Sequence, residues 1–198
     1  MSDIADSVAE YPTVGTVDGD DVALTVVTSP IGQLLAGADG FGICILEFAS
    51  SDPHTQLARL SHTFRGRFVR SSTPATELLE HELVSYFAGT LQTFSVPISL
   101  NGTTFQKSVW GALRQIPYGQ TRSYGDQAAS LGKLKAVRAV GHANGQNPVS
   151  IVVPCHRVIG ADGSLTGYGG GLWRKKWLLR HEGATFRDPD LQTTLDFG

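Results

Sequence analysis

The sequence predicts an α+β protein built of two lobes. Three apolar runs rich in β-branched residues follow one another between positions 22 and 48, separated by short turn sequences. This pattern is typical of an antiparallel sheet. From position 104 onward the apolar residues recur with helical spacing instead, which predicts a second, mostly helical lobe. The length of 198 residues is enough for two small domains.

The composition is that of an ordinary globular chain, with 41% hydrophobic and 17% charged residues. No run approaches the eighteen or so apolar residues of a membrane span, and the first residues are acidic, unlike a signal peptide. We therefore expect a cytoplasmic protein without membrane contact. The two cysteines, Cys44 and Cys155, stand at no disulfide or zinc spacing, and Cys44 is interpreted as a core residue.

The net charge of −2 hides an asymmetry between the halves of the chain. Residues 1–100 contain four Lys/Arg against twelve Asp/Glu, whereas residues 101–198 contain twelve against six. A basic lobe suggests a polyanionic partner such as nucleic acid, although a solvated basic face gives the same pattern. The basic half is the half that contains Cys155.

The first lobe is expected to begin after a flexible lead-in over residues 1–20, which has few large apolar side chains. The α+β domain follows over residues 21–95. Its strands are the runs VALTVVTS, QLLAGA and FGICILEF, with hairpin turns between them. Asp52-Pro53 and Thr73-Pro74 each predict a helix start with proline at the first helical position, and Gly89 predicts the end of the second helix.

Residues 96–103 are expected to form a connector, because VPISLNGT contains a proline, an Asn-Gly turn and no helical period. The second domain then covers residues 104–184, and residues 185–198 form a tail. A helix is predicted over Thr104–Ile116, where the apolar positions form a stripe and Pro117 prevents continuation.

Two further helices predict a helix-turn-helix. The first spans Ser123–Ser130 and opens with the capping sequence Ser-x-x-Asp. The second spans Lys135–Asn144, is closed by Gly145 and follows a tight turn. Its Val137 and Val140 are expected to face the core.

The outer face of that last helix is thin. Arg138 stands on it among small residues, which are Ala136, Ala139, Gly141 and Ala143. A thin face would let a nucleic-acid backbone come close, with the arginine bound to phosphate or filling space in the base stack. The alternative is an ordinary surface arginine on a packed helix.

The stretch Ile151–Gly160, IVVPCHRVIG, contains the candidate nucleophile. Three β-branched residues predict a buried strand that Pro154 ends, so Cys155 stands where the strand breaks into a turn. His156 and Arg157 follow directly, and a neighbouring base or cation is what makes a thiol reactive near neutral pH. The alternative is a buried structural cysteine.

Three segments carry a family resemblance: FQKSVWGALRQIPYGQTRSY, RAVGHANGQNPVSIVVPCHRVIG and GSLTGYGGGLWRKKWLL, in this order. Over roughly Thr104–Gly183 the chain resembles the O6-alkylguanine-DNA alkyltransferases, or methylated-DNA-protein-cysteine methyltransferases, of the bacterial constitutive type. The resemblance implies a ribonuclease-H-like first lobe and a winged helix-turn-helix second lobe. It also implies a single-turnover repair reaction, in which one protein accepts one alkyl group from O6-alkylguanine or O4-alkylthymine.

The resemblance implies five catalytic roles. Cys155 would accept the alkyl group as a thioether. His156 would deprotonate the thiol through a water molecule, and Glu182 would orient and charge-balance the imidazole. Asn147 would tie the recognition helix to the active-site turn. Tyr124 would help to rotate the target nucleotide out of the duplex and could donate a proton to the leaving guanine.

The resemblance also implies the DNA contacts. Arg138 would take the place of the extruded base, and the other DNA-binding residues would be Tyr124, Lys133, Ala136 and Gly141. The substrate pocket would be lined by Pro148, Val153, Tyr168, Gly169 and Gly170. Some relatives carry serine where this chain has Gly169, so a side-chain contact to the guanine oxygen is missing there. The expected partner is double-stranded alkylated DNA bound through its minor groove by a monomer, without cofactor or zinc.

Two other functions stay open at this point. Alkyltransferase-like proteins bind damaged DNA and recruit other repair proteins, but they lack the acceptor cysteine, so Cys155 argues against this class. A cysteine hydrolase could use Cys155 and His156, but it needs an oxyanion hole that the sequence does not reveal. Product release over many cycles would support a hydrolase, and stoichiometric loss of the thiol would exclude one.

Overall fold

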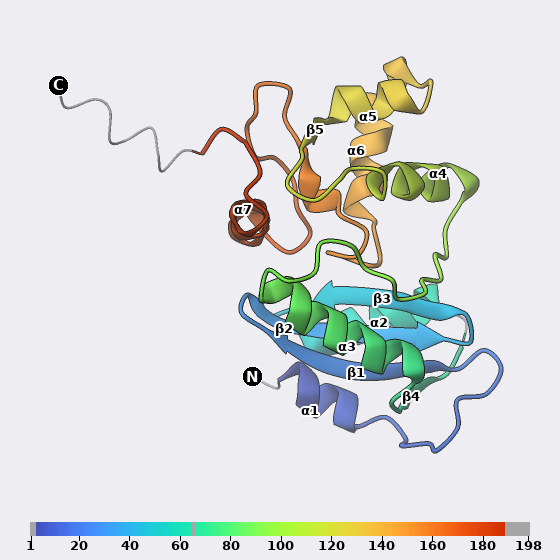
Figure 1. Ribbon diagram of the computed structural model, residues 1–198. Helices are drawn as coiled ribbons and strands as arrows, with labels where there is room; N and C mark the ends of the chain where they lie inside the picture. The colour runs from blue at the N-terminus through green and yellow to red at the C-terminus, as the bar shows by residue number, and fades with distance from the viewer. Residues whose placement is uncertain (1–2, 65, 189–198) are drawn as a thin grey trace. The chain divides into compact units, whose positions relative to one another are not determined.

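The protein is described by a computed structural model that covers residues 3–64 and 66–188 (Figure 1). The chain divides into two compact units, Met1–Asn101 and Gly102–Gly198. The division falls inside the segment 96–103 expected as a connector. Each unit is described by itself below.

The first unit is built on a four-stranded sheet. The three predicted strands form β1 (Val22–Ser29), β2 (Gly32–Asp39) and β3 (Gly42–Phe48), which pair antiparallel as expected. A short fourth strand, β4 (Phe68–Arg70), pairs parallel with β1 and gives the order β3-β2-β1-β4. The sequence pattern does not predict β4, because three residues are too few to show an alternation.

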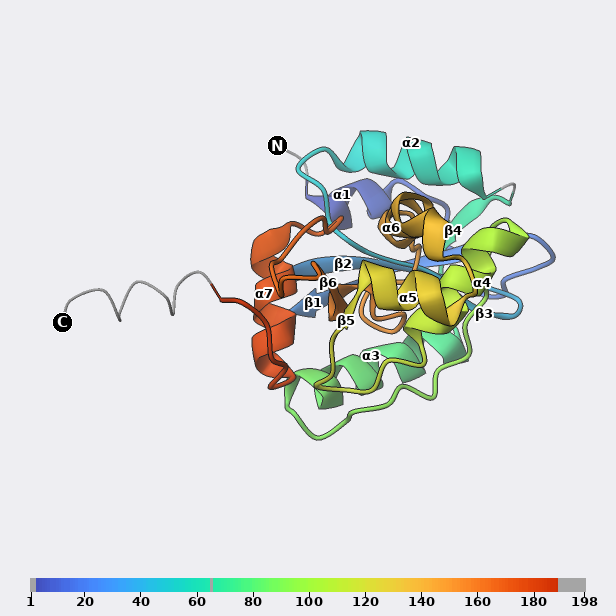
Figure 2. The same cartoon turned by 90° about the horizontal axis from the view of Figure 1, so that it is seen from above.

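Helices cover both faces of this sheet. Helix α1 (Ile4–Ala9) and helix α2 (Pro53–Thr63) lie on one face, and α3 (Pro74–Phe87) lies on the other (Figures 1 and 2). The predicted helix starts are confirmed: the side chains of Asp52 and Thr73 accept backbone hydrogen bonds in the first turns of α2 and α3.

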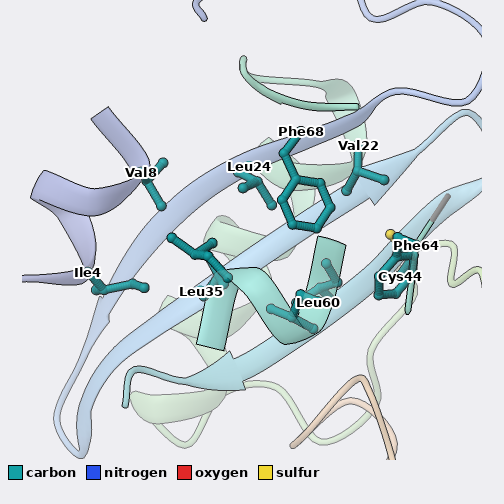
Figure 3. Packing of buried hydrophobic residues seen from close by; sticks show 11 residues of the cluster. Ile4, Val8, Val22, Leu24, Leu35, Cys44, Leu60, Phe64 and Phe68 are labelled. Carbon is teal, nitrogen blue, oxygen red and sulfur yellow. The ribbon is translucent and has the colours of Figure 1, made fainter. Parts of the chain in front are cut away.

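The core beneath α1 and α2 includes residues from the expected lead-in. Ile4 and Val8, one helical turn apart, are 1% and 3% exposed and pack with Leu24, Leu35 and other apolar side chains (Figure 3). The expectation of a flexible lead-in is therefore wrong for residues 4–9. Two apolar side chains on one short helix face are too weak a signal in the sequence, but the sheet supplies the surface that they bury.

The second unit contains a cluster of three helices, α4 (Thr104–Leu113), α5 (Tyr124–Ser130) and α6 (Val137–Gly145). Helix α4 ends three residues before the predicted Ile116, although Ile116 is still buried. The capping box of α5 is confirmed. Ser123 caps the helix, and its side chain and that of the third helical residue bond to each other's backbone N–H groups.

Helices α5 and α6 form the predicted helix-turn-helix, with a single 3₁₀ turn, η1 (Leu134–Ala136), between them. Val140 faces the core as expected, but Val137 is 37% exposed and Ala143 is buried, so the expected faces are partly wrong. The packed face of α6 begins one turn after its first residue, because the positions from η1 to Ala139 have no buried side chain.

Buried polar contacts fix the orientation of α6. Gln127 of α5 and Asn144 of α6 exchange two amide hydrogen bonds, of 3.2 Å and 2.7 Å. The indole Nε1 of Trp110 in α4 donates to the carbonyl oxygen of Ala143 at 2.8 Å. All four side chains are at most 5% exposed. A fully satisfied buried polar pair favours one arrangement of the helices.

The remaining elements follow the helix-turn-helix. Strands β5 (Arg122–Ser123) and β6 (Val158–Ile159) form a small parallel pair, and α7 (Leu172–His181) is the last helix of the described residues. The expected tail, 185–198, lies mostly outside the described residues; within the described part, the buried Asp188 pairs with Arg180 of α7 at 2.6 Å. In the described part of the chain, no helix is long and apolar enough to cross a membrane.

Candidate active site

The segment before Cys155 is a buried turn and not the predicted strand. Ile151 and Val153 are at most 1% exposed, as expected, but the backbone bonds locally: the amide of Val153 donates to Val149 and that of Val152 to Ser150. Ile151 has φ of 71°, a left-handed conformation that is costly for a β-branched residue. Burial explains the apolar run here, so the strand prediction is wrong.

Asn147 holds this turn together. Its Oδ1 accepts from the amide of Val149 at 3.1 Å, and its Nδ2 donates to the carbonyl of Val153 at 2.7 Å and to Cys155 Sγ at 3.3 Å. The backbone amide of Asn147 donates to the carbonyl of Asn144 in α6. One residue thus links the end of α6 to the turn and to the thiol.

Cys155 opens a 3₁₀ turn, η2 (Cys155–Arg157), and the residue as a whole is half-buried. Burial of the sulfur raises the pKa of the thiol, whereas the hydrogen bond from Asn147 and the nearby ammonium of Lys175 oppose this effect. A raised pKa means that the resting group is a neutral thiol at physiological pH. Nucleophilic attack therefore needs a base that takes the proton.

His156 is placed as such a base. Its side chain is fully buried, and Nε2 lies 2.8 Å from Glu182 Oε1. Since an ionised carboxylate only accepts hydrogen bonds, Nε2 carries the proton and donates it. Burial lowers the pKa of the imidazole, so the ring is neutral. Its Nδ1 is buried and has no hydrogen-bond partner among residues 3–64 and 66–188, which leaves a basic lone pair available.

Glu182 follows directly after α7, and its carboxylate is fully buried. Burial alone would raise its pKa, but hydrogen bonds from His156 and Arg157 outweigh burial and hold the pKa well below the usual range. The amide of Gly119 donates to Glu182 Oε2 at 3.2 Å. Gly119 has φ of 73°, and a Cβ there would lie 2.8 Å from the Glu182 carbonyl oxygen, so this approach requires glycine.

Lys175 of α7 is a buried cation beside the thiol. Nothing in the sequence singles out this lysine. Its Nζ donates to the carbonyls of Val158 and Thr166, at 2.6 Å and 2.7 Å, and burial lowers its pKa to about 8. The ammonium thus joins β6 to the loop before α7. In the sequence it stands within the run Arg174-Lys175-Lys176, which is indistinguishable from a solvated helix face.

Tyr124 is the first residue of α5 and lies against the same loop. Its hydroxyl donates to the carbonyl of Thr166 at 3.2 Å, and the ring centroid is 5.8 Å from Lys175 Nζ. Burial raises the pKa of the phenol, which keeps its proton at neutral pH. A Cβ added at Gly141 would lie 3.6 Å from the Tyr124 ring, so two predicted DNA-binding positions are neighbours.

The other predicted DNA-binding positions lie on the helix-turn-helix. Arg138 and Lys133 are exposed, and Ala136 is half-buried in η1. The ammonium of Lys133 lies 6.0 Å from the centroid of the Phe105 ring in α4. Helix α6 packs against the core through Val140, and the exposed side chain of Arg138 takes no part in this packing.

The predicted pocket residues come from two segments. Pro148 and Val153 belong to the turn before Cys155, and Val153 is fully buried. Tyr168, Gly169 and Gly170 belong to the loop before α7; the Tyr168 hydroxyl is buried, and a Cβ at Gly169 would meet nothing within 4 Å. Over the described ranges, no group of three or more His, Cys, Asp or Glu side chains could hold a metal ion.

The chain is similar in sequence to known proteins. Residues 104–184 match the family model described as 6-O-methylguanine DNA methyltransferase, DNA binding domain. A methylated-DNA-protein-cysteine methyltransferase of Mycolicibacterium paratuberculosis is 60% identical over 157 residues, which cover 79% of this chain and 89% of that protein.

Solved structures show the same fold. The O6-methylguanine methyltransferase of Mycobacterium tuberculosis has a TM-score of 0.71 at 42% identity, covering 86% of this chain and 99% of that one. A structure of the M. tuberculosis protein in complex with DNA has a TM-score of 0.69 at 43% identity, covering 82% and 92%. The α+β fold, with a sheet-containing first unit and a helical second unit that contains the winged helix-turn-helix, is that of these neighbours. The chain belongs to the methylated-DNA-protein-cysteine methyltransferase family.

Proposed function

We propose that this protein repairs DNA by moving the alkyl group from O6-alkylguanine, and from O4-alkylthymine, to its own Cys155. One observation carries this: the Cys155 thiol, bonded by Asn147, directly precedes a buried neutral imidazole whose Nδ1 has no partner in the described chain. Sγ attacks the alkyl carbon, a carbon–sulfur bond forms and the carbon–oxygen bond breaks. Among the described residues, no group of the site is placed to cleave the thioether and restore the thiol, so each molecule acts once.

The proton of the thiol passes to His156. Because Nε2–H is committed to Glu182, the free Nδ1 is the atom that accepts the proton, through a bridging water. The Glu182 carboxylate then stabilises the imidazolium, as in other base-plus-orienter pairs. The leaving guanine oxygen takes a proton, and Tyr124 is the donor proposed for this step because its phenol stays protonated.

Duplex DNA is the proposed partner, bound through its minor groove by α6 in a protein that acts as a monomer. The exposed Arg138 fills the gap left when the alkylated nucleotide is extruded, and Pro148, Val153 and residues 168–170 surround the extruded base. Extrusion costs a few kcal/mol, less for a base whose pairing is already weakened. We place the reaction in the cytoplasm, where thiols stay reduced, because Cys44 and Cys155 are both free.

Intact mass measurement tests the proposal. The protein is mixed with excess duplex containing O6-methylguanine and then digested for peptide mapping. One added methyl group on Cys155, saturating at one per protein, is the expected result. Unmodified protein that still binds the duplex would instead indicate a damage sensor, and demethylated product in excess of protein would indicate a hydrolase.

Replacing Arg138 with alanine should slow repair of duplex DNA by about tenfold or more, because the gap in the base stack is no longer filled. Reaction with free O6-benzylguanine, which needs no extrusion, should stay within about twofold of wild type. The measurement is the single-turnover rate on both substrates. Arg59→Ala removes an exposed arginine from the first unit as a control. Equal losses on duplex and free base would contradict the role given to Arg138.

A further inference from the structure

Arg157 is a buried cation that the mechanism above leaves without a role. It directly follows His156, and it is 7% exposed. Its guanidinium binds Glu182 with two hydrogen bonds, from Nε to Oε2 at 2.8 Å and from Nη2 to Oε1 at 3.0 Å. Its Nη1 donates to the carbonyl oxygen of Ile116 at 2.6 Å. The side chain therefore joins the catalytic carboxylate to the segment that follows α4.

These bonds complete the coordination of the Glu182 carboxylate. Oε1 accepts from His156 Nε2 and Arg157 Nη2, while Oε2 accepts from Arg157 Nε and the amide of Gly119. A carboxylate offers about four acceptor positions, and all of them are used. The two-point contact prevents rotation of the carboxylate, so Oε1 stays in line with Nε2 of the imidazole.

The same contact also affects the charge of the His156 imidazole. A buried carboxylate facing only an imidazole favours the imidazolium, because opposite charges attract strongly where water is excluded. With Arg157 present, the guanidinium offsets part of the Glu182 charge, so the carboxylate attracts a protonated His156 less strongly. In the described chain, the charged or titratable groups around His156 come from four places. They are Cys155 and Arg157 in η2, Lys175 on α7, Glu182 directly after α7, and two tyrosines, Tyr118 near Glu182 and Arg157 and Tyr168 near Cys155 and Glu182. Burial is the main cause of the lowered pKa of the imidazole, and the two cations among these groups lower it further.

We propose that Arg157 is a positioning residue of the transfer reaction: its guanidinium fixes the Glu182 carboxylate and keeps His156 in the neutral form whose Nδ1 is a base. The inference rests on the proposed function of His156. Arg157 touches neither the thiol nor any reacting atom, and it acts only through its neighbours.

Two substitutions separate charge from geometry. Arg157→Gln removes the positive charge but keeps a donor for Glu182, and Arg157→Lys keeps the charge but cannot make the two-point contact. Single-turnover transfer from methylated duplex is measured between about pH 6 and pH 9. For Arg157→Gln we expect the acid limb of the rate profile to move to higher pH. The transfer rate should be about tenfold lower than wild type at neutral pH and should return to the wild-type rate toward pH 9. For Arg157→Lys we expect loss by a similar factor at every pH.

A merely structural role for Arg157 would lower the Gln variant's rate by the same factor across the pH range, and this result would overturn the proposal. So would a Lys variant as fast as wild type at every pH. If one of the two variants does not fold, the pH profile of the other still tests the positioning role of Arg157. Arg59→Gln, which removes an arginine from the ion pair with Glu47 in the first unit, is the control and should leave the profile unchanged.

Nitrogen-15 NMR of histidine-labelled protein gives a readout that does not depend on transfer. His156 in the wild type should show the neutral Nε2–H form at neutral pH. In the Arg157→Gln variant, the His156 side chain should be protonated to imidazolium up to a higher pH than in the wild type. Identical titrations would overturn the proposal even if transfer is normal. Wild-type protein that shows the neutral form but transfers no methyl group would instead contradict the proposed function alone.

Discussion

Cys155→Ala protein is expected to show no methyl transfer, while its affinity for duplex DNA stays within about twofold of wild type. The thiol forms the new carbon–sulfur bond of the proposed reaction, whereas affinity is proposed to come from contacts of α6 with the phosphate backbone. The variant also loses only one hydrogen bond, from Asn147 at 3.3 Å. The measurements are intact mass after incubation with O6-methylguanine duplex and a binding titration at fixed salt concentration.

The chain contains its own control for this experiment. Cys44 is fully buried in the first unit, its thiol donates to the Gly37 carbonyl, and burial raises its pKa to about 12. Cys44→Ala should therefore transfer and bind like wild type. Joint loss of transfer and binding in Cys155→Ala would contradict the separation of the two functions, and methylation of Cys44 would contradict the assignment of the acceptor.

Glu182→Gln should impair both catalysis and stability. The amide cannot neutralise Arg157, and breaking a buried ion pair by removing one partner costs about 3–5 kcal/mol. Transfer should slow by about 10²-fold or more, because the imidazolium loses its counter-charge. Urea unfolding followed by tryptophan fluorescence measures the stability, since all three tryptophans, Trp110, Trp173 and Trp177, belong to the second unit.

The pH dependence of this stability loss has a definite sign. The pKa of Glu182 is held well below its usual range in the folded protein, so the unfolded chain binds more protons between the two pKa values. Stability from this group is complete above the unfolded pKa of about 4.3 and is lost as the pH falls toward the folded pKa. The difference in unfolding free energy between wild type and Glu182→Gln should therefore narrow below about pH 4.

Glu82→Gln is the matched control for this prediction. Glu82 is 5% exposed and accepts hydrogen bonds from Ser95 and from the amide of Val96 in the first unit. It is a buried, fully bonded glutamate with no link to His156, so its replacement should leave the transfer rate within about twofold of wild type. Equal transfer losses in the two variants would show that destabilisation, and not the counter-charge, slows Glu182→Gln.

Local signals in the sequence predict much of the fold. The helix caps Asp52, Thr73 and Ser123 are confirmed, because a capping bond depends on residues within one turn. The hairpin strands are also confirmed, since each turn joins strands that are neighbours in the chain. Helix α1 and strand β4 are missed because tertiary contacts stabilise short elements that carry little pattern of their own.

The site was predictable only in part. The family resemblance brings Asn147, His156 and Glu182 to notice, and their placement beside Cys155 is compatible with the roles it implies. Arg157 and Lys175 need the tertiary structure, because a buried cation is recognised by its distant partners, Glu182 in one case and two backbone carbonyls in the other. The apolar run at Ile151–Val153 wrongly predicts a strand, because a buried turn can have the same apolar residue types as a core strand.

The left-handed backbone at Ile151 makes the position of the Cys155 thiol depend on the packing around the turn. A β-branched residue does not choose this conformation locally, at a cost of about 1–3 kcal/mol, so the surrounding core and the hydrogen bonds of Asn147 must impose it. The reach of Cys155 toward a substrate is therefore a property of the whole second unit. Substitutions that loosen the packing around Ile151 would let the turn change conformation. They would displace the nucleophile even if every catalytic side chain were unchanged.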